Sequence, residues 1–360
     1  AVVAIGKGLS LKPDAAETHN NLAAVLRNLG RLKESAEHYR RALALDPGHQ
    51  DAHEGLATVA LLLGHFTEGW EHYRHRISMR IPGAILPPPT LPSDLTGRRV
   101  LVVRDQGVGD EIFFLRFAAQ LRAREVLLMY RPDPRLTAML ARTGIFNRVL
   151  EPDEVAEADC ACSVGDLPWL LGMYGHVDVP PALTLSPLPI RCNELRARLA
   201  LLGQSPYIGV TWRAGDKTKA RVLYKACPLP DLARVLRPVP GTVLVLQRQP
   251  AEGEIGAFAR ELNRPAHDLS ALNDDLEQML ALLSLIDEYV GVSNTNMHLR
   301  AAVGKTARVL VPSPPEWRWM AEGRESPWFP GFSVYRQGYD GSWEGAFDML
   351  GADLNHVYGR

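Results

Sequence analysis

The first eighty residues repeat with a period of 34, and this period limits the possible folds more strongly than any other feature of the chain. The segment AEHYRRAL at 36–43 returns as WEHYRHRI at 70–77, and each unit holds two amphipathic stretches separated by Leu-Gly. Other matched residues one period apart are Pro13 and Pro47, His19 and His53, Leu22 and Leu56, Gly30 and Gly64, and Tyr39 and Tyr73. A repeat of this length predicts pairs of helices that bury their apolar faces by stacking on neighbouring repeats.

The period and the residue pattern resemble those of the tetratricopeptide repeat. Residues 1–13 match the second helix of such a repeat, because Leu11 and Pro13 fall one period before Leu45 and Pro47. We therefore expect tetratricopeptide repeats over residues 1–80, with the first repeat incomplete and further repeats upstream in the natural protein. Such repeats offer a concave surface to a protein or peptide partner, and the alternative is a purely structural cap on the next domain.

The remainder of the chain has the pattern of an α/β protein. A proline-rich stretch at 81–97, IPGAILPPPTLPSDLTG, predicts a stiff linker. Short apolar runs then alternate with helical stretches, which predicts two lobes with parallel sheets, at 98–190 and 205–340. The predicted strands are VLVVR (100–104), VLLMY (126–130), RVL (148–150), ADCACSV (158–164), YIGVTW (207–212), TVLVLQ (242–247), DEYVGVS (287–293) and ARVLVP (307–312). Residues 341–360 read as an amphipathic helix.

Charge and composition exclude several classes of partner. The chain has 40 basic and 41 acidic side chains and a net charge of −1, so no overall field favours nucleic acid or an anionic membrane. No apolar run approaches the ~20 residues of a membrane span, and no secretory leader opens the sequence. We therefore expect a cytoplasmic protein without a membrane span. The 4 cysteines lack the spacing of a zinc site.

Several motifs follow one another in a recognisable order after the linker. They are QGVGDEIFFLRF (106–117), GVTWRAG (209–215), a lysine-rich loop (217–225), VLQ (245–247), the segment 274–305 around SNTNMH, and PPEWRWM with SPWFP and VYRQ (314–337). This order resembles GT-B glycosyltransferases related to the bacterial heptosyltransferases, in the branch that carries tetratricopeptide repeats. The resemblance implies two Rossmann-like lobes facing a cleft, with the acceptor on the first lobe and a nucleotide-sugar donor on the second. In such a fold the C-terminal helix crosses back onto the first lobe.

The first-lobe motif places two glycines and two carboxylates where a strand turns into a helix. Gly107 and Gly109 permit a tight turn close to a ligand. By the resemblance, Asp110 is the candidate base that removes the acceptor's proton, whereas its alternative role is to cap the helix. Asp105 and Gln106 belong to the same loop, and Asp105 is a candidate contact to substrate.

In the second lobe, the resemblance and the residue chemistry suggest a donor-phosphate site. Arg213 follows Trp212 at the end of a predicted strand, and its guanidinium suits phosphate oxygens. The basic loop holds Lys217, Lys219 and Arg221, and it ends at Lys225, the member that best matches the family. Solvation of this charged loop is the alternative interpretation.

The SNTNMH segment opens a helix after an apolar strand. Its polar side chains and free backbone N–H groups suit an anion, and the candidate donor ligands are Ser293, Asn294, Thr295, Asn296 and His298. The family commonly has an Asp near Ser293 or Asn294, and this chain lacks it. Gln247 is a further candidate contact to the nucleotide, and Glu277 is a candidate ligand of a ribose hydroxyl.

These features favour an enzyme that moves a sugar from a nucleotide-sugar to a protein acceptor presented by the repeats, and flagellin is a candidate acceptor by resemblance. No Asp-x-Asp pair is placed to hold a divalent ion, so we expect inverting, metal-independent transfer with no cofactor. One alternative is a catalytically degenerate binding module, which the missing Asp favours. The other is transfer to lipopolysaccharide core, against which the repeats argue.

Overall fold

The computed structural model describes residues 15–80, 90–215 and 224–359. The chain divides into two compact units. Unit 1 comprises Ala1–Asp133, Ile145–Pro181 and Pro314–Gly323, and unit 2 comprises Pro134–Gly144, Ala182–Ser313 and Arg324–Arg360. Unit 1 thus holds the repeats together with the first lobe, and unit 2 holds the second lobe.

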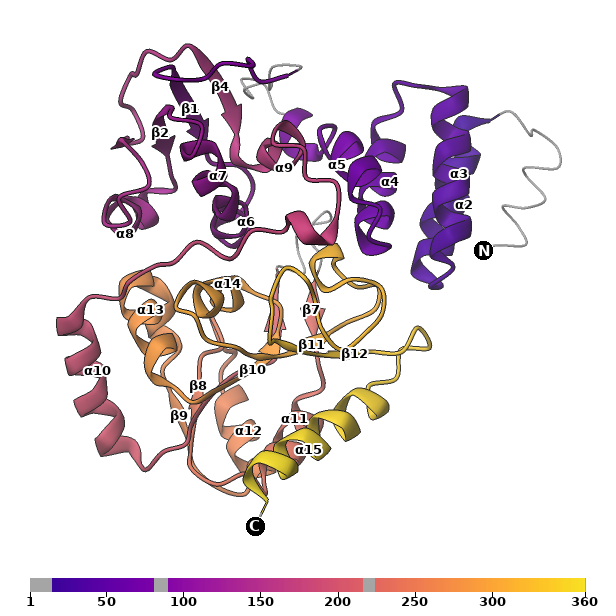
Figure 1. Cartoon of the computed structure of the whole chain (residues 1–360). Helices are drawn as coiled ribbons and strands as arrows, with labels where there is room; N and C mark the ends of the chain where they lie inside the picture. The colour runs from indigo at the N-terminus through magenta and orange to yellow at the C-terminus, as the bar shows by residue number, and fades with distance from the viewer. Residues whose placement is uncertain (1–14, 81–89, 216–223, 360) are drawn as a thin grey trace. The chain divides into compact units, whose positions relative to one another are not determined.

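The repeat region of unit 1 is a stack of antiparallel helices, as the period predicts. Its helices are α2 (Ala16–Asn28), α3 (Leu32–Leu45), α4 (Gln50–Leu62) and α5 (Phe66–Tyr73), and each packs on the next (Figure 1). Gly30 and Gly64 have φ of 76° and 79° and end the first helix of each pair, where a left-handed residue favours glycine. Residues 1–14, which carry the expected incomplete repeat, lie outside the described residues.

The first lobe is a four-stranded parallel sheet in the order β3-β2-β1-β4. Its strands are β1 (Arg99–Val103), β2 (Leu127–Arg131), β3 (Arg148–Val149) and β4 (Cys160–Ser163), which confirms the four predicted strands of this lobe. Because all four strands run the same way, the loops after β1, β2 and β4 leave one edge of the sheet. This carboxyl edge is where α/β folds bind ligands.

A segment far along the chain completes unit 1. The 3₁₀ turn η7 (Trp317–Trp319) packs on α4, and Ala321 N donates to Leu62 O at 3.0 Å. The Trp317 ring centroid lies 5.3 Å from that of Trp70 and 5.2 Å from that of Phe113. The boundary predicted at 205–340 is therefore wrong for residues 314–323, because their aromatic side chains are buried among the repeats and the first lobe.

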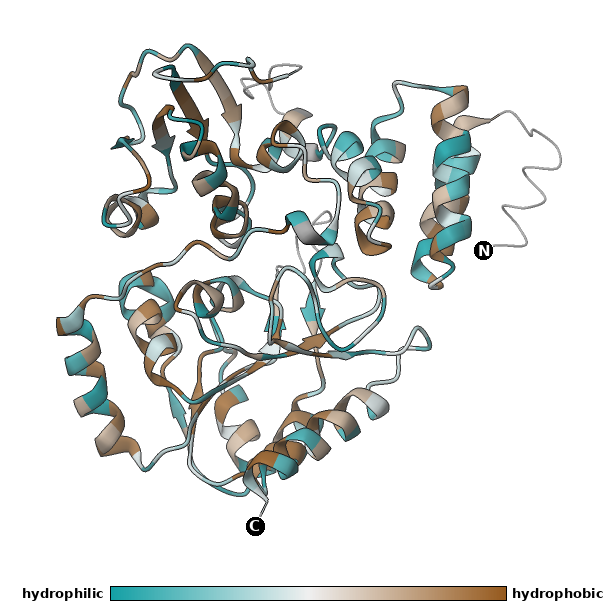
Figure 2. Cartoon of the chain, in the orientation of Figure 1, coloured by the Kyte–Doolittle hydropathy of each residue, from teal (hydrophilic) through white to brown (hydrophobic). Residues whose placement is uncertain are grey.

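The second lobe is a six-stranded parallel sheet in the order β12-β11-β10-β5-β8-β9. The strands are β5 (Tyr207–Thr211), β8 (Thr242–Val245), β9 (Ala266–Asp268), β10 (Glu288–Val292), β11 (Arg308–Val311) and β12 (Ser333–Arg336). Hydrophobic colouring follows its central strands (Figure 2), which are buried on both faces and so read as continuous apolar runs. A two-stranded antiparallel ribbon, β6 (Arg213–Ala214) with β7 (Lys225–Ala226), follows β5.

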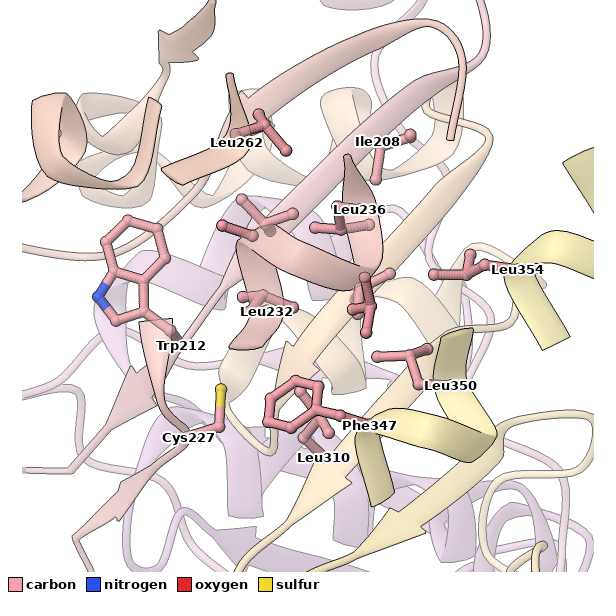
Figure 3. Packing of buried hydrophobic residues seen from close by; sticks show 14 of the residues in the cluster. Ile208, Trp212, Cys227, Leu232, Leu236, Leu262, Leu310, Phe347, Leu350 and Leu354 are labelled. Carbon is pink, nitrogen blue, oxygen red and sulfur yellow. The ribbon is translucent and has the colours of Figure 1, made fainter. Parts of the chain in front are cut away.

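The C-terminal helix corrects one expectation about the second lobe. Helix α15 (Glu344–Tyr358) packs on α11 (Leu229–Leu236) and on β12, within unit 2. Figure 3 shows Phe347, Leu350 and Leu354 turned into a cluster with Leu232 and Leu236, and all five are fully buried. The expectation that this helix packs back on the first lobe is therefore wrong, because its apolar face belongs to the second lobe's core.

Two further segments of unit 2 differ from the predicted boundaries. The short helix α8 (Thr137–Ala141) belongs to unit 2 rather than to the lobe at 98–190, and Arg142 after it pairs with Glu277 at 2.7 Å. Helix α10 (Pro189–Leu202), which the sequence did not predict, packs on α13 (Leu276–Leu285). Within the described ranges, no helix is long and apolar enough to cross a membrane.

Candidate active site

Asp110 stands at the carboxyl edge of the first sheet, in the first turn of the helix that follows β1. This helix, α6, spans Val108–Phe114, with Gly107 as its N-cap. Asp110 Oδ2 accepts a hydrogen bond from Gly107 N at 3.3 Å, so the carboxylate caps the helix as one of the two sequence-based interpretations expected. Its side chain is 29% exposed, which leaves part of it open to a ligand.

The second oxygen of Asp110 is paired with a guanidinium from η7. Arg318 Nη2 donates to Asp110 Oδ1, and the Arg318 side chain is only 8% exposed. Its guanidinium carbon lies 4.4 Å from the Trp317 ring centroid and 4.7 Å from that of Phe113, so aromatic rings hold it in place. Burial and the nearby charge of Arg318 lower the pKa of Arg116 to about 9. Arg318 therefore places a positive charge directly against Asp110.

Asp105 serves the fold rather than a ligand. It is buried, and its Oδ2 accepts from Arg76 Nε at 2.6 Å. Arg76 also donates from Nη1 to Asp166 Oδ1 at 2.7 Å, and Asp166 Oδ2 accepts from Ser163 N at 3.0 Å. Burial raises the pKa of Asp166 while Arg76 opposes that shift. The structure does not support the expected contact between Asp105 and substrate, because Arg76 and the surrounding chain enclose this carboxylate.

The loop between Asp105 and Asp110 has one residue in the left-handed region. Gln106 has φ of 57°, and its Nε2 donates to the Tyr73 hydroxyl at 2.6 Å. Gln106 itself is exposed, as is Gly107, and Gly109 is half-buried. Backbone in this region is costly for a residue with a side chain and is found where neighbouring contacts hold it. The loop is therefore accessible, and Tyr73 of the second repeat holds its conformation.

Glu111 lies next to Asp110 in the sequence but occupies a different environment. It is buried, and its Oε1 accepts from the Tyr130 hydroxyl at 2.9 Å and from Asp133 N at 3.0 Å. Burial raises the pKa of Glu111 to about 7, against the effect of these two hydrogen bonds. It joins α6 to the loop after β2 and is not presented to a ligand.

At the carboxyl edge of the second sheet, two predicted donor ligands prove to be buried. Trp212 lies in the hydrophobic core, with its Nε1 donating to Glu254 Oε1 at 2.7 Å. Gln247 is 2% exposed, and its Oε1 accepts from Trp212 N at 3.1 Å and Arg213 N at 3.0 Å. Gln247 thus ties the end of β8 to the end of β5. A direct contact of either side chain with the nucleotide is not supported, because both are enclosed.

Arg213 is partly exposed and already carries a carboxylate partner. Its Nη2 donates to Glu254 Oε2 at 2.6 Å and to Gln249 O at 2.9 Å. The pairing lowers the pKa of Glu254 despite the burial of this carboxyl, with Arg213 and Trp212 as hydrogen-bond donors. A phosphate bound at Arg213 would share the N–H donors of the guanidinium with Glu254.

The SNTNMH segment forms the start of α14 (Thr295–Ala302), as predicted. Asn294 is the N-cap: its Oδ1 accepts from Asn296 N at 2.8 Å, and its Nδ2 donates to Thr211 Oγ1 at 2.9 Å. Asn296 Nδ2 donates to Asn273 Oδ1 at 3.2 Å, and Ser293 and His298 are buried as well. Thr295 is half-buried. The Asn294 and Asn296 side chains therefore connect the strand ends with the helix cap. The anion site remains a prediction.

The other predicted donor ligands are in different surroundings. Glu277, at the start of α13, is paired with Arg142, so its carboxylate is committed to an ion pair within unit 2. Lys225 is half-buried in β7. Lys217, Lys219 and Arg221 lie outside the described residues. In the parts of the chain that the structure covers, no three His, Cys, Asp or Glu side chains gather as metal ligands.

Sequence reasoning missed Tyr73, Arg76 and Arg318, the residues that hold the Asp105–Asp110 loop. A signal for Arg76 was present, because the position one period earlier is Ala42, a small residue typical of a helix contact. No comparable signal marks Arg318, because its partner lies 208 residues away in the chain.

Comparison with known proteins supports the repeats and the fold. Residues 16–49 match the family model of the tetratricopeptide repeat. Protein FlbA from Caulobacter vibrioides is 28% identical over an alignment of 278 residues, and the match covers 70% of this chain and 45% of FlbA. The chain therefore spans less than half the length of that relative.

Two solved structures resemble the chain at low identity. The glycosyl transferase family 9 structure from Veillonella parvula has a TM-score of 0.52 and 12% identity, and the match covers 71% of this chain and 90% of that one. The E. coli ADP-heptose lps heptosyltransferase II has a TM-score of 0.47 and 15% identity, with 72% of this chain and 99% of that one covered. The first match shows that two parallel-sheet lobes of the GT-B kind follow the repeats.

Proposed function

We propose that this chain is an inverting, metal-independent glycosyltransferase that moves a sugar from a nucleotide-sugar to a protein acceptor. The observation that carries the proposal is the position of Asp110. Its partly exposed carboxylate stands at the carboxyl edge of a parallel sheet, in the same compact unit as the repeats. A protein held by the repeats is therefore held by the unit that carries the candidate base.

Asp110 is the residue to which we assign the proton transfer. Its carboxylate takes the proton of the acceptor hydroxyl while the hydroxyl oxygen attacks the anomeric carbon, and the bond from that carbon to the leaving phosphate oxygen breaks. Arg318 fixes Oδ1 and Gly107 N contacts Oδ2. The incoming hydroxyl would bind at the free side of Oδ2, because a second lone pair of that oxygen remains available there.

The leaving diphosphate needs positive charge and N–H donors. In the second lobe, the N-terminal turn of α14 and the Arg213 guanidinium stand after strands of the same parallel sheet. These groups suit a phosphate that gains charge as the sugar departs, which supports transfer without a metal. Flagellin is a candidate acceptor by resemblance.

The test is a donor screen followed by a turnover assay. Thermal shift with UDP, GDP, ADP and CMP and their sugars identifies the nucleotide, and mass spectrometry of acceptor proteins detects the transferred sugar. The Asp110→Asn variant should bind the same nucleotide and transfer no sugar. The control is Asp159→Asn, which removes a carboxylate at the opposite edge of the same sheet, where Asp159 pairs with Arg99 at 3.0 Å. If Asp110→Asn and Asp159→Asn transfer sugar equally well, Asp110 is not the base.

A second candidate function is a binding module without turnover. Two ion pairs favour it, because Asp110 is already paired with Arg318, and Arg213 is already paired with Glu254. In that case the protein binds a nucleotide in the screen, but no donor is consumed and no acceptor gains mass.

A further inference from the structure

The second repeat departs from the first at two positions that both face the first lobe. Trp70 and Arg76 stand one period after Ala36 and Ala42, which are small and buried in the first repeat. The Trp70 ring centroid lies 5.3 Å from that of Trp317, and its Nε1 donates to Met173 Sδ at 3.2 Å. The repeat pattern is thus broken where the array meets the lobe.

Arg76 links the ends of two strands at the carboxyl edge. It pairs with Asp105, which follows β1, and with Asp166, which follows β4, at 2.6 Å and 2.7 Å. All three side chains are almost fully enclosed, with exposed fractions of 4%, 3% and 0%. Gly165 leaves the room for them, because a Cβ there would lie 2.9 Å from Asp105 Oδ2.

Tyr73 acts on the next residue of the same loop. Its hydroxyl accepts from Gln106 Nε2 at 2.6 Å, and Gln106 has the left-handed backbone that needs such support. The loop that ends at Asp110 is therefore held at Asp105 by Arg76 and at Gln106 by Tyr73.

We infer that Tyr73 and Arg76 are positioning residues that hold the Asp105–Asp110 loop in the shape in which Asp110 can act, so that the second repeat is a working part of the acceptor site. This inference rests on the proposed function for its catalytic consequence. It also means that deleting residues 1–80 is not a clean test of acceptor binding, because the deletion removes the partners of Asp105, Asp166 and Gln106.

The first test compares two tyrosines at the same repeat position. Tyr73→Phe keeps the ring but removes the hydroxyl that Gln106 contacts. Tyr39→Phe makes the same change one period earlier, where the tyrosine packs over Gly55. Amide hydrogen exchange of peptides covering 105–110 should become about fivefold faster in Tyr73→Phe, the effect of one lost hydrogen bond, and stay unchanged in Tyr39→Phe. Equal exchange in both variants overturns the inference.

The second test removes the ion pairs without leaving a buried charge alone. A triple variant, Arg76→Met with Asp105→Asn and Asp166→Asn, takes out the whole charged set, because single removal of one partner would destabilise the fold. Circular dichroism should show the native helix content, and exchange at 105–110 should rise. The nucleotide Kd should stay unchanged while kcat falls at least tenfold. A loosened loop with unchanged kcat overturns the positioning role.

The two proposals fail in different ways. If the wild-type protein consumes no donor and modifies no acceptor, the proposed function fails. The exchange measurement still decides whether Tyr73 and Arg76 hold the loop, because it requires no turnover.

Discussion

Arg318 pairs with Asp110 across 208 residues of sequence, within one compact unit. The pair joins the first helix of the first lobe to a segment that follows the last central strand of the second lobe's sheet. Because Trp317 and Phe113 enclose the guanidinium, Arg318 has little freedom to leave Asp110. We conclude that the candidate base is oriented by a residue from outside its own lobe's sequence.

The first prediction concerns this pair. Arg318→Met should leave the protein folded and lower kcat by about ten- to a hundredfold, because Asp110 loses the donor that fixes its Oδ1. The measurement is the rate of transfer at saturating donor. Arg324→Met is the control, since it removes another arginine–carboxylate pair, with Asp353, in unit 2. A kcat reduced equally in both variants would attribute the loss to stability instead of orientation.

The second prediction follows from the raised pKa of Glu111. The pKa of Glu111 is about 7 in the folded protein and 4.5 for an unperturbed glutamate. Between these pH values the unfolded chain releases a proton that the folded chain keeps. Stability therefore falls as pH rises from about 4.5 to 7, by at most ~3 kcal/mol. Glu111→Gln keeps an acceptor for Tyr130 and should raise the free energy of unfolding at pH 8 but not at pH 4.5. Urea denaturation at both values checks this, with exposed Glu157→Gln as control.

A third prediction concerns two histidine pairs that recur in the repeats. The Nδ1 atoms are 2.9 Å apart in His19–His38 and 2.8 Å apart in His53–His72, so each pair needs a neutral ring as acceptor. Burial is the main cause that lowers the pKa of His38 and of His72, and the charge of the paired histidine lowers it further. The unfolded chain thus binds more protons, and the stability of the repeats should fall as pH drops below about 6.5.

The double variant His38→Asn and His72→Asn tests this pH effect. Its urea midpoint should change less between pH 7.5 and pH 5.5 than that of the wild type. An unchanged pH dependence would assign the effect to other groups.

A fourth prediction tests where the C-terminal helix packs. Phe347 is fully buried in the core of the second lobe, so Phe347→Ala should cost about 3–5 kcal/mol of stability. Met349, 39% exposed on the same helix, provides the control Met349→Ala, which should change stability little. Hydrogen exchange should localise the loosening to α11 and β12. Loosening confined to β1 and β2 would mean that the helix packs on the first lobe after all.

The sequence predicted those parts of the fold in which buried residues form a clear apolar pattern. Central strands such as β5 and β10 were found, because strands buried on both faces are continuous apolar runs. The edge strands β9 and β12 were missed, since they are short and carry polar residues such as His267 and Arg336. The apolar face of α15 was visible, but the pattern does not say which lobe receives it.

The candidate site was predicted only in part. The capping role of Asp110 was predicted, because a glycine turn followed by an acid at a helix start is a local pattern, and its role as base stays a prediction. The burial of Gln247 and Trp212 was not predicted, because a residue at a strand end can face either the ligand or the core, and sequence spacing does not separate the two. Arg318 acts through a contact between distant segments that no local pattern reveals, whereas the break in the repeat at Arg76 was visible but did not name its partners.

The most direct test of the account is the transfer rate of Asp110→Asn. Using the donor found in the screen and a protein acceptor, single-turnover transfer is followed by mass spectrometry for the wild type, Asp110→Asn and Asp159→Asn. The account predicts nucleotide binding in all three, wild-type rates for Asp159→Asn, and a loss of about a hundred- to ten-thousandfold for Asp110→Asn. Transfer by Asp110→Asn within a few-fold of the wild type would contradict it.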